Sequence, residues 1–160
     1  MFKTKNDLDE AKRVKVCQLL NDRLSDAIDL MLQTKQAHWN VKGPHFISYH
    51  LLFDGVYEAV SEGVDQLAER LVQLGGKAEG TVQVVGKRST VPPYPIEIAD
   101  GLDHIQALST AIATVGKGTR QAIDTADQLG DKGTSDLFTS VSRELDKQLW
   151  FVEAHLQGGG

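Results

Sequence analysis

The placement of proline constrains the fold of this chain most strongly. Prolines occur only at Pro44 and within residues 92–95, so long segments lack the residue that interrupts helices. In the first of these segments, apolar or small residues recur at steps of three and four, which forms one stripe along a helix. This periodicity predicts a helix from about residue 7 to residue 40, and the next step of its stripe is His38. The stripe consists of Cys17, Leu20, Leu24, Ala27, Met31 and Thr34.

A second helix is expected from about Pro44 to Leu74, because Gly43 precedes it and a glycine pair follows it. Helical periodicity is then lost over residues 77–98, which we interpret as a long loop crossing from one end of a bundle to the other. The stripe of the second helix consists of Phe46, Phe53, Val60, Val64, Leu67 and Leu71.

Two further helices follow the crossover. Asp100 or Asp103 is expected to cap the third, and Thr134 or Ser135 the fourth, with a glycine-containing corner at residues 130–133 between them. Two helical hairpins joined by one long crossover are the topology of a ferritin-like four-helix bundle. We therefore predict an all-α fold.

Composition and charge exclude several classes of protein. The 160 residues fit one domain, residues 1–160, and a hydrophobic content of 41% excludes intrinsic disorder. A net charge of −5 argues against a basic nucleic-acid-binding face, and no apolar run is long enough for a membrane span. The N-terminus lacks the apolar stretch of a secretory signal, and the single Cys17 rules out an internal disulfide. We therefore expect a reducing, cytoplasmic setting.

Histidines and acids are spaced so as to suggest a metal site. His50 and Asp54 are four residues apart, as are Asp65 and Glu69, so each pair lies on one helix face. Asp54 and Asp65 are separated by eleven residues, about three helical turns, so both pairs share that face. His38 lies on the neighbouring helix, and imidazole with carboxylate is a ligand set for iron, zinc or manganese.

The two pairs cannot serve one metal ion within one chain, because Asp54 and Asp65 lie roughly 16 Å apart along the helix axis. Either each pair binds weakly by itself, or two copies of the helix run antiparallel about a two-fold axis. Pairs of this kind are also common as ordinary surface features. No histidine has a Glu three residues before it, so the internal di-iron motif of other bundles is absent.

Several motifs resemble the signature of the Dps family, the mini-ferritins of starved bacterial cells, and the resemblance covers essentially the whole chain. They are TKQAHWNVKGPHF at residues 34–46, His50, FDG at 53–55, DQLAER at 65–70, LGG at 74–76 and DKQLWF at 146–151.

The resemblance implies a ferroxidase centre between two-fold-related subunits. His38, His50 and Asp54 would come from one chain, and Asp65 and Glu69 from the other, to bind two iron ions. It further implies a hollow homododecamer that oxidises Fe(II), preferentially with hydrogen peroxide, and stores the ferric product. Zinc is a possible substitute for iron, which leaves a structural zinc-binding cage as another interpretation.

Other residues carry weaker expectations. We expect Trp39 to pack in the core rather than to intercept oxidising equivalents, and Trp150 and Phe151 to be core residues. Cys17 is expected to be a small buried apolar residue. Four acids crowd the last corner, where they either cap helices or, in a shell, line a three-fold pore that attracts cations. These acids are Asp124, Asp127, Asp131 and Asp136.

A nucleoid-compacting DNA-binding protein with secondary iron chemistry is the alternative function. DNA-binding members of the family resemble one another in having long lysine-rich tails. Here the N-terminal segment 1–7 offers only Lys3 and Lys5, and residues 157–160 form an uncharged tail that we expect to be flexible. Tight DNA binding is therefore not expected.

Overall fold

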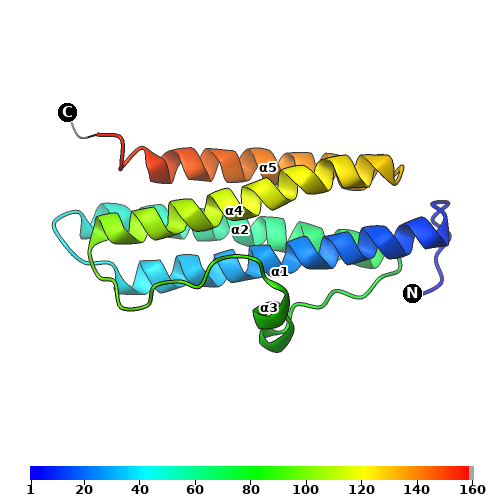
Figure 1. Ribbon diagram of the computed structural model, residues 1–160, viewed down its shortest axis with the longest axis horizontal. Coiled ribbons are helices and arrows are strands. Elements are labelled where there is room, and N and C mark those ends of the chain that lie inside the picture. Colours follow the sequence, from blue (N-terminus) through cyan, green and yellow to red (C-terminus); the bar gives the residue numbers. More distant parts are fainter. Residues whose placement is uncertain (159–160) are drawn as a thin grey trace.

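The computed structural model describes residues 1–158, and these form an all-α bundle (Figure 1). Residues 159–160 of the predicted tail lie outside the described residues. No helix in the described part is long and apolar enough to cross a membrane. The helices are α1 (Glu10–Asn40), α2 (Phe46–Gln73), α3 (Val82–Arg88), α4 (Gly101–Gln128) and α5 (Lys132–Glu153).

The four long helices form two antiparallel hairpins, α1 with α2 and α4 with α5 (Figure 1). The hairpins contact each other through α1 with α4 and through α2 with α5, which closes a four-helix bundle. A long connection runs along the outside of the bundle from the end of α2 to the start of α4. The predicted ferritin-like topology is confirmed.

The crossover is not the structureless loop that we expected, because it contains the two-turn helix α3. Only Val85 of this helix is buried, and the helix packs on the outside of α1. Seven residues are too few to display a recognisable apolar stripe. Asp26 and His104, both buried, anchor the rest of the crossover. Asp26 accepts a hydrogen bond from Thr90 N at 2.8 Å, and Nδ1 of His104 shares a hydrogen bond with the Tyr94 hydroxyl at 2.5 Å.

The bundle interior contains two groups of buried apolar side chains. One lies toward the α1–α2 connection and is centred on Phe53, with Leu30, Ile105 and Ile112. The other lies toward the opposite end and is centred on Phe138. Cys17 belongs to the second group, so its predicted burial is confirmed.

Aspartates cap three of the helices. Asp9 caps α1 and Asp100 caps α4, as one of the two expected candidates. The prediction for α5 was wrong, because Asp131, rather than Thr134 or Ser135, caps it. The helix starts earlier than expected, at Lys132, and Asp131 accepts hydrogen bonds from both the backbone N–H and the hydroxyl of Thr134.

The three large aromatic side chains expected in the core lie at the surface of the chain. Trp39 is 68% exposed, Trp150 63% and Phe151 37%. Their helices are amphipathic, and these residues fall on the outer side of each helix. The core interpretation was therefore wrong for a single chain, and the exposed rings are available to a neighbouring molecule.

Candidate metal centre

Two histidines from different helices stack at one end of the bundle. His38 lies in the last turn of α1 and His50 lies near the start of α2. Their ring centroids are 3.6 Å apart. The connection that brings them together turns at Gly43, whose φ of 109° is a conformation that other residues rarely adopt.

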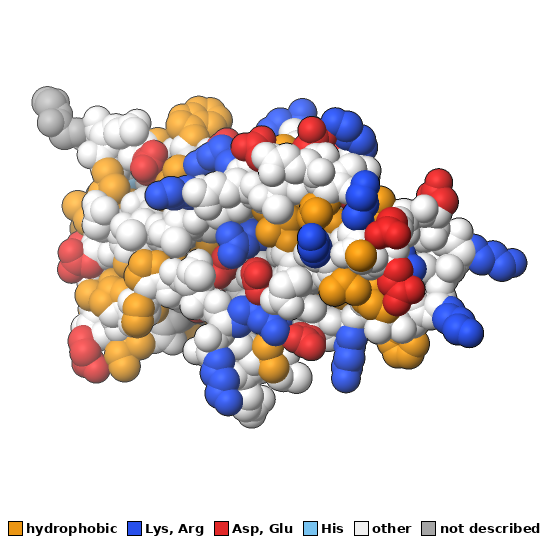
Figure 2. Space-filling model, turned by 45° about the vertical axis from the view of Figure 1, so that its right-hand side comes forward, with side chains coloured by type: hydrophobic (Ala, Val, Ile, Leu, Met, Phe, Trp, Pro, Cys, Tyr) orange, Lys and Arg blue, Asp and Glu red, His pale blue; other side chains and the backbone are white. Residues whose placement is uncertain are grey.

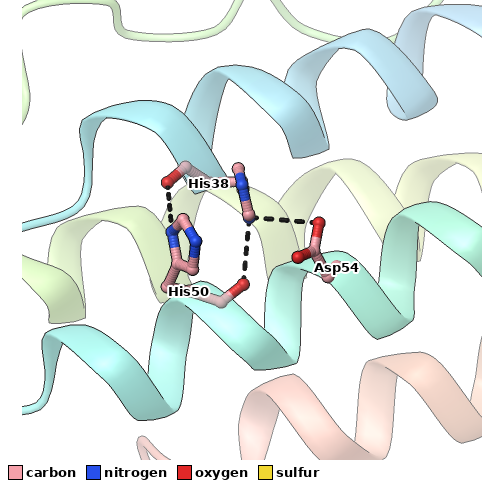
Figure 3. A group of neighbouring side chains, drawn as sticks. All are labelled: His38, His50 and Asp54. Carbon is pink, nitrogen blue, oxygen red and sulfur yellow. Dashed lines mark hydrogen bonds and ion pairs between the residues drawn. The ribbon is translucent and has the colours of Figure 1, made fainter.

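Reciprocal hydrogen bonds fix the orientation of both rings (Figure 3). Nδ1–H of His38 donates to the backbone carbonyl of His50, and Nδ1–H of His50 donates to the carbonyl of His38, each at 3.0 Å. Because a carbonyl oxygen only accepts, Nδ1 carries the proton and Nε2 of the neutral ring keeps its lone pair. A hydrogen bond of this kind commonly sets the tautomer of a metal-binding histidine. Both rings are therefore prepared to bind a cation through Nε2.

Asp54 lies one turn beyond His50 on α2 and completes the cluster. Its Oδ1 is 3.2 Å from Nδ1 of His38 (Figure 3). Each of the three side chains offers a ligand atom within 4.8 Å of the others. Within residues 1–158 this is the one such group of three or more histidine, cysteine or acidic side chains.

Lys35, which the sequence analysis missed, is the direct counter-ion of Asp54. Its Nζ lies 2.6 Å from Oδ1 of Asp54 and 4.4 Å from the centre of the Tyr57 ring. The hydrogen bond from Lys35 holds the pKa of Asp54 below its usual value, and His38 and His50 act in the same direction. The signal was present in the sequence, because Lys35 precedes His38 by three residues and so shares its helix face.

Asp65 and Glu69 lie further along the same helix, where the side chains of both are exposed. The axial distance of roughly 16 Å from Asp54 to Asp65 keeps them away from the histidines of their own chain. The structure therefore brings together three of the five predicted ligands in one chain and leaves two apart, on the same face of α2.

The four corner acids have different surroundings. Asp131 is buried, where it caps α5 and accepts a hydrogen bond from Arg70 at 2.9 Å. Asp124, Asp127 and Asp136 are exposed, and of these Asp127 pairs with Lys132. Two of these acids thus already have structural partners within the chain.

Comparison with known proteins identifies the family. The ferritin-like domain model matches residues 17–159. The chain is also 47% identical over 155 residues to the DNA protection during starvation protein of Agrobacterium fabrum (strain C58), which covers 97% of this chain and 96% of the relative. This chain belongs to the Dps family of ferritin-like proteins.

Solved Dps structures have the same fold as this family member. Mycobacterium smegmatis Dps in a tetragonal crystal form superposes with a TM-score of 0.91 at 36% identity, covering 96% of this chain and 94% of that one. The Dps protein of Vibrio cholerae O1 superposes with a TM-score of 0.90 at 26% identity and 98% coverage of both chains. That protein is described as a member of a broad superfamily of ferritin-like diiron-carboxylate proteins.

The ion pair between Lys35 and Asp54 leads to a first prediction. The Lys35 ammonium competes for Asp54 and repels a cation bound there, so Lys35→Met is expected to tighten Zn²⁺ or Co²⁺ binding about three- to tenfold. Titration calorimetry of the metal-free protein measures the change, with the exposed Lys15→Met as the control. Unchanged or weaker binding in Lys35→Met would show that the lysine does not compete with the cation.

Proposed function

We propose that this Dps-family chain is a bacterial cytoplasmic ferroxidase that oxidises Fe(II) and stores the ferric product. Fe(II) is the substrate, and the observation that carries the proposal is the cluster of His38, His50 and Asp54, with both Nε2 atoms left free by the reciprocal hydrogen bonds. Imidazole binds Fe(II) well, and hard carboxylate oxygens favour Fe(III), so the donor set promotes the oxidation.

Asp65 and Glu69 of a second copy complete the site in this proposal. The two α2 helices run antiparallel about a two-fold axis that passes midway between residues 59 and 60. This one axis pairs Asp54 with Asp65 of the other copy and His50 with Glu69, because each pair is symmetric about that point in the numbering. An isologous dimer then contains two identical sites.

Apolar side chains on the same face of α2 support this pairing. Ile47 and Leu51 are each 60% exposed, and Val72 is 56% exposed. The same two-fold axis places Ile47 opposite Val72 of the other copy, so apolar contacts lie at both ends of the paired acids. Exposed apolar patches of this kind are typical of protein interfaces. Trp39, beside His38, adds a further exposed ring.

The reaction balances with hydrogen peroxide as the oxidant. Two Fe(II) ions each give one electron to H2O2, the O–O bond breaks, and two protons yield two molecules of water and two Fe(III) ions. Two iron ions held at one site deliver both electrons together, which avoids the release of hydroxyl radical. We propose peroxide as the preferred oxidant on this ground, and a homododecamer as the shell around the stored product.

Access for Fe(II) is proposed through pores at three-fold axes of the shell. Asp124 and Asp136, which are exposed and have no ion-pair partner in the described residues, are the better candidates for attracting cations there. Asp127 and Asp131 are held by Lys132 and Arg70 and would contribute mainly through their charge.

The ferroxidase proposal predicts rapid oxidation of about two Fe(II) per H2O2 by the metal-free protein, and slower oxidation by O2. Stopped-flow absorbance of the ferric product measures both rates after anaerobic loading. His50→Gln should slow the peroxide reaction at least tenfold, whereas His45→Gln, in an exposed histidine outside the cluster, should leave it unchanged. Protein that binds zinc but oxidises Fe(II) no faster than buffer does would instead indicate a structural metal cage.

Tight binding to duplex DNA is not part of the proposed function. The N-terminal segment is held against the body, because Phe2 N donates to Gly75 O at 2.7 Å and Arg13 bonds the carbonyls of both Leu8 and Leu74. On the face shown in Figure 2, basic side chains are interspersed with acidic ones and form no continuous basic area. The net charge of −5 per chain also repels phosphate.

We therefore predict no shift of plasmid DNA by stoichiometric protein at about 150 mM salt without magnesium. A gel-shift assay makes the measurement, and a variant with several lysines added at the N-terminus is the positive control, because each Lys–phosphate contact releases a counterion. A clear shift by the unmodified protein under these conditions would favour the nucleoid-compacting alternative.

A further inference from the structure

A cavity of about 470 Å³ opens between α2 and α5 and extends into the middle of the bundle. Its inner wall includes Ala27 of α1 and Val115 of α4, so all four long helices contribute to it. Bundle interiors are normally filled to the density of an organic crystal. A space of this size falls in the range of small-molecule sites, about 300–1,000 Å³.

The cavity exists because the wall positions of α2 and α5 carry small residues. These are Ala59 and Gly63 on α2 and Ser140 on α5. A Cβ atom added at Gly63 would lie 3.8 Å from the nearest atom of Val141, which is an ordinary contact distance. The packing of α2 against α5 therefore does not require a glycine at this position. Glycine also destabilises a helix relative to most other residues. Gly63 therefore lowers both the stability of the helix and the packing of the core at one position, as expected of a binding site.

The mouth of the cavity carries two acids and two bases, and among these four Arg143 alone lacks a hydrogen-bond partner in the described part of the chain. Glu62 accepts a hydrogen bond from Gln66 at 2.8 Å, and Glu144 accepts from Gln148 at 2.7 Å and from Lys147 at 3.2 Å. Arg143, in contrast, has no ion-pair or hydrogen-bond partner in the described part of the chain, and its side chain is exposed at the rim. An apolar interior with a free guanidinium at its entrance is complementary to an amphipathic anion.

We infer that this cavity binds a straight-chain carboxylate, with the hydrocarbon among Ala27, Val115, Val141 and Leu145 and the carboxylate on Arg143. At roughly 30 Å³ per heavy atom, the volume of one water in the liquid, the cavity holds about fifteen heavy atoms. A carboxylate of eight to twelve carbons fits this estimate. The site lies on a different face of α2 from Asp54 and Asp65, so it is independent of the proposed iron oxidation.

Titration calorimetry of the assembled protein with decanoate, below its micelle concentration, tests the inference. We expect saturable binding of one decanoate per chain, with affinity falling about fourfold for each methylene removed from the ligand. Arg143→Gln should weaken decanoate binding about three- to tenfold and leave 1-decanol binding unchanged. Lys117→Gln, in an exposed lysine outside the cavity, is the matched control and should change neither.

Filling the cavity provides the second arm of the experiment. Gly63→Leu should reduce decanoate binding at least tenfold, because its side chain occupies the space that the ligand needs. Ser140→Leu fills the same space from α5 and is used in place of Gly63→Leu if that variant does not fold. The inference would be overturned if decanoate did not bind saturably, or if the folded, filled variant bound it as tightly as the wild type. It would also be overturned if Arg143→Gln lost decanol binding to the same extent as decanoate binding, or if decyltrimethylammonium bound as tightly as decanoate.

Discussion

The rigidity of α2 is the constraint on which the functional interpretation depends. A continuous helix holds Asp54 and Asp65 roughly 16 Å apart, and no local rearrangement of one chain brings them to the same ion. The histidines are equally fixed, because each donates to the backbone carbonyl of the other across the α1–α2 hairpin. In the function that we propose, such a chain presents half of a site at each of two places, and an antiparallel dimer joins the halves.

The rest of the bundle supports that geometry. Gly43 allows the sharp connection that places His38 against His50, and a backbone hydrogen bond from Lys42 to Ala99 ties the connection to the end of the crossover. Phe53 lies wholly buried beside Asp54 in the sequence, so core packing fixes the register of α2 at the site. Lys35 forms an ion pair with Asp54 and lowers the pKa of its carboxyl group. The position of each candidate ligand therefore follows from features outside the cluster itself.

Much of this architecture could be predicted from the sequence, because long apolar stripes and glycine-marked helix ends are local signals. The short helix α3 could not, since one buried valine leaves no periodic pattern. The α5 cap was misplaced because Asp131, Thr134 and Ser135 are all good capping residues, and only the hydrogen bonds distinguish them. Trp39 and Trp150 were misassigned because hydrophobicity does not reveal whether a ring faces its own core or another molecule. At the site, helical spacing indicated the His50–Asp54 pair and also placed Lys35 on the helix face of His38. The ion pair of Lys35 with Asp54, which lies on the other helix, became apparent only in three dimensions.

The central claim, that two chains share each site, is tested most directly by mixing two inactive variants. Asp54→Ala removes a ligand from one half of the site and Glu69→Ala removes one from the other, so each variant alone should lose rapid Fe(II) oxidation. A mixed dimer contains one site with all its ligands and one lacking both. Random co-assembly should therefore restore about a quarter of the wild-type sites, seen as a matching fraction of the rapid phase. Complete inactivity of assemblies in which mixing has been verified would contradict the shared site.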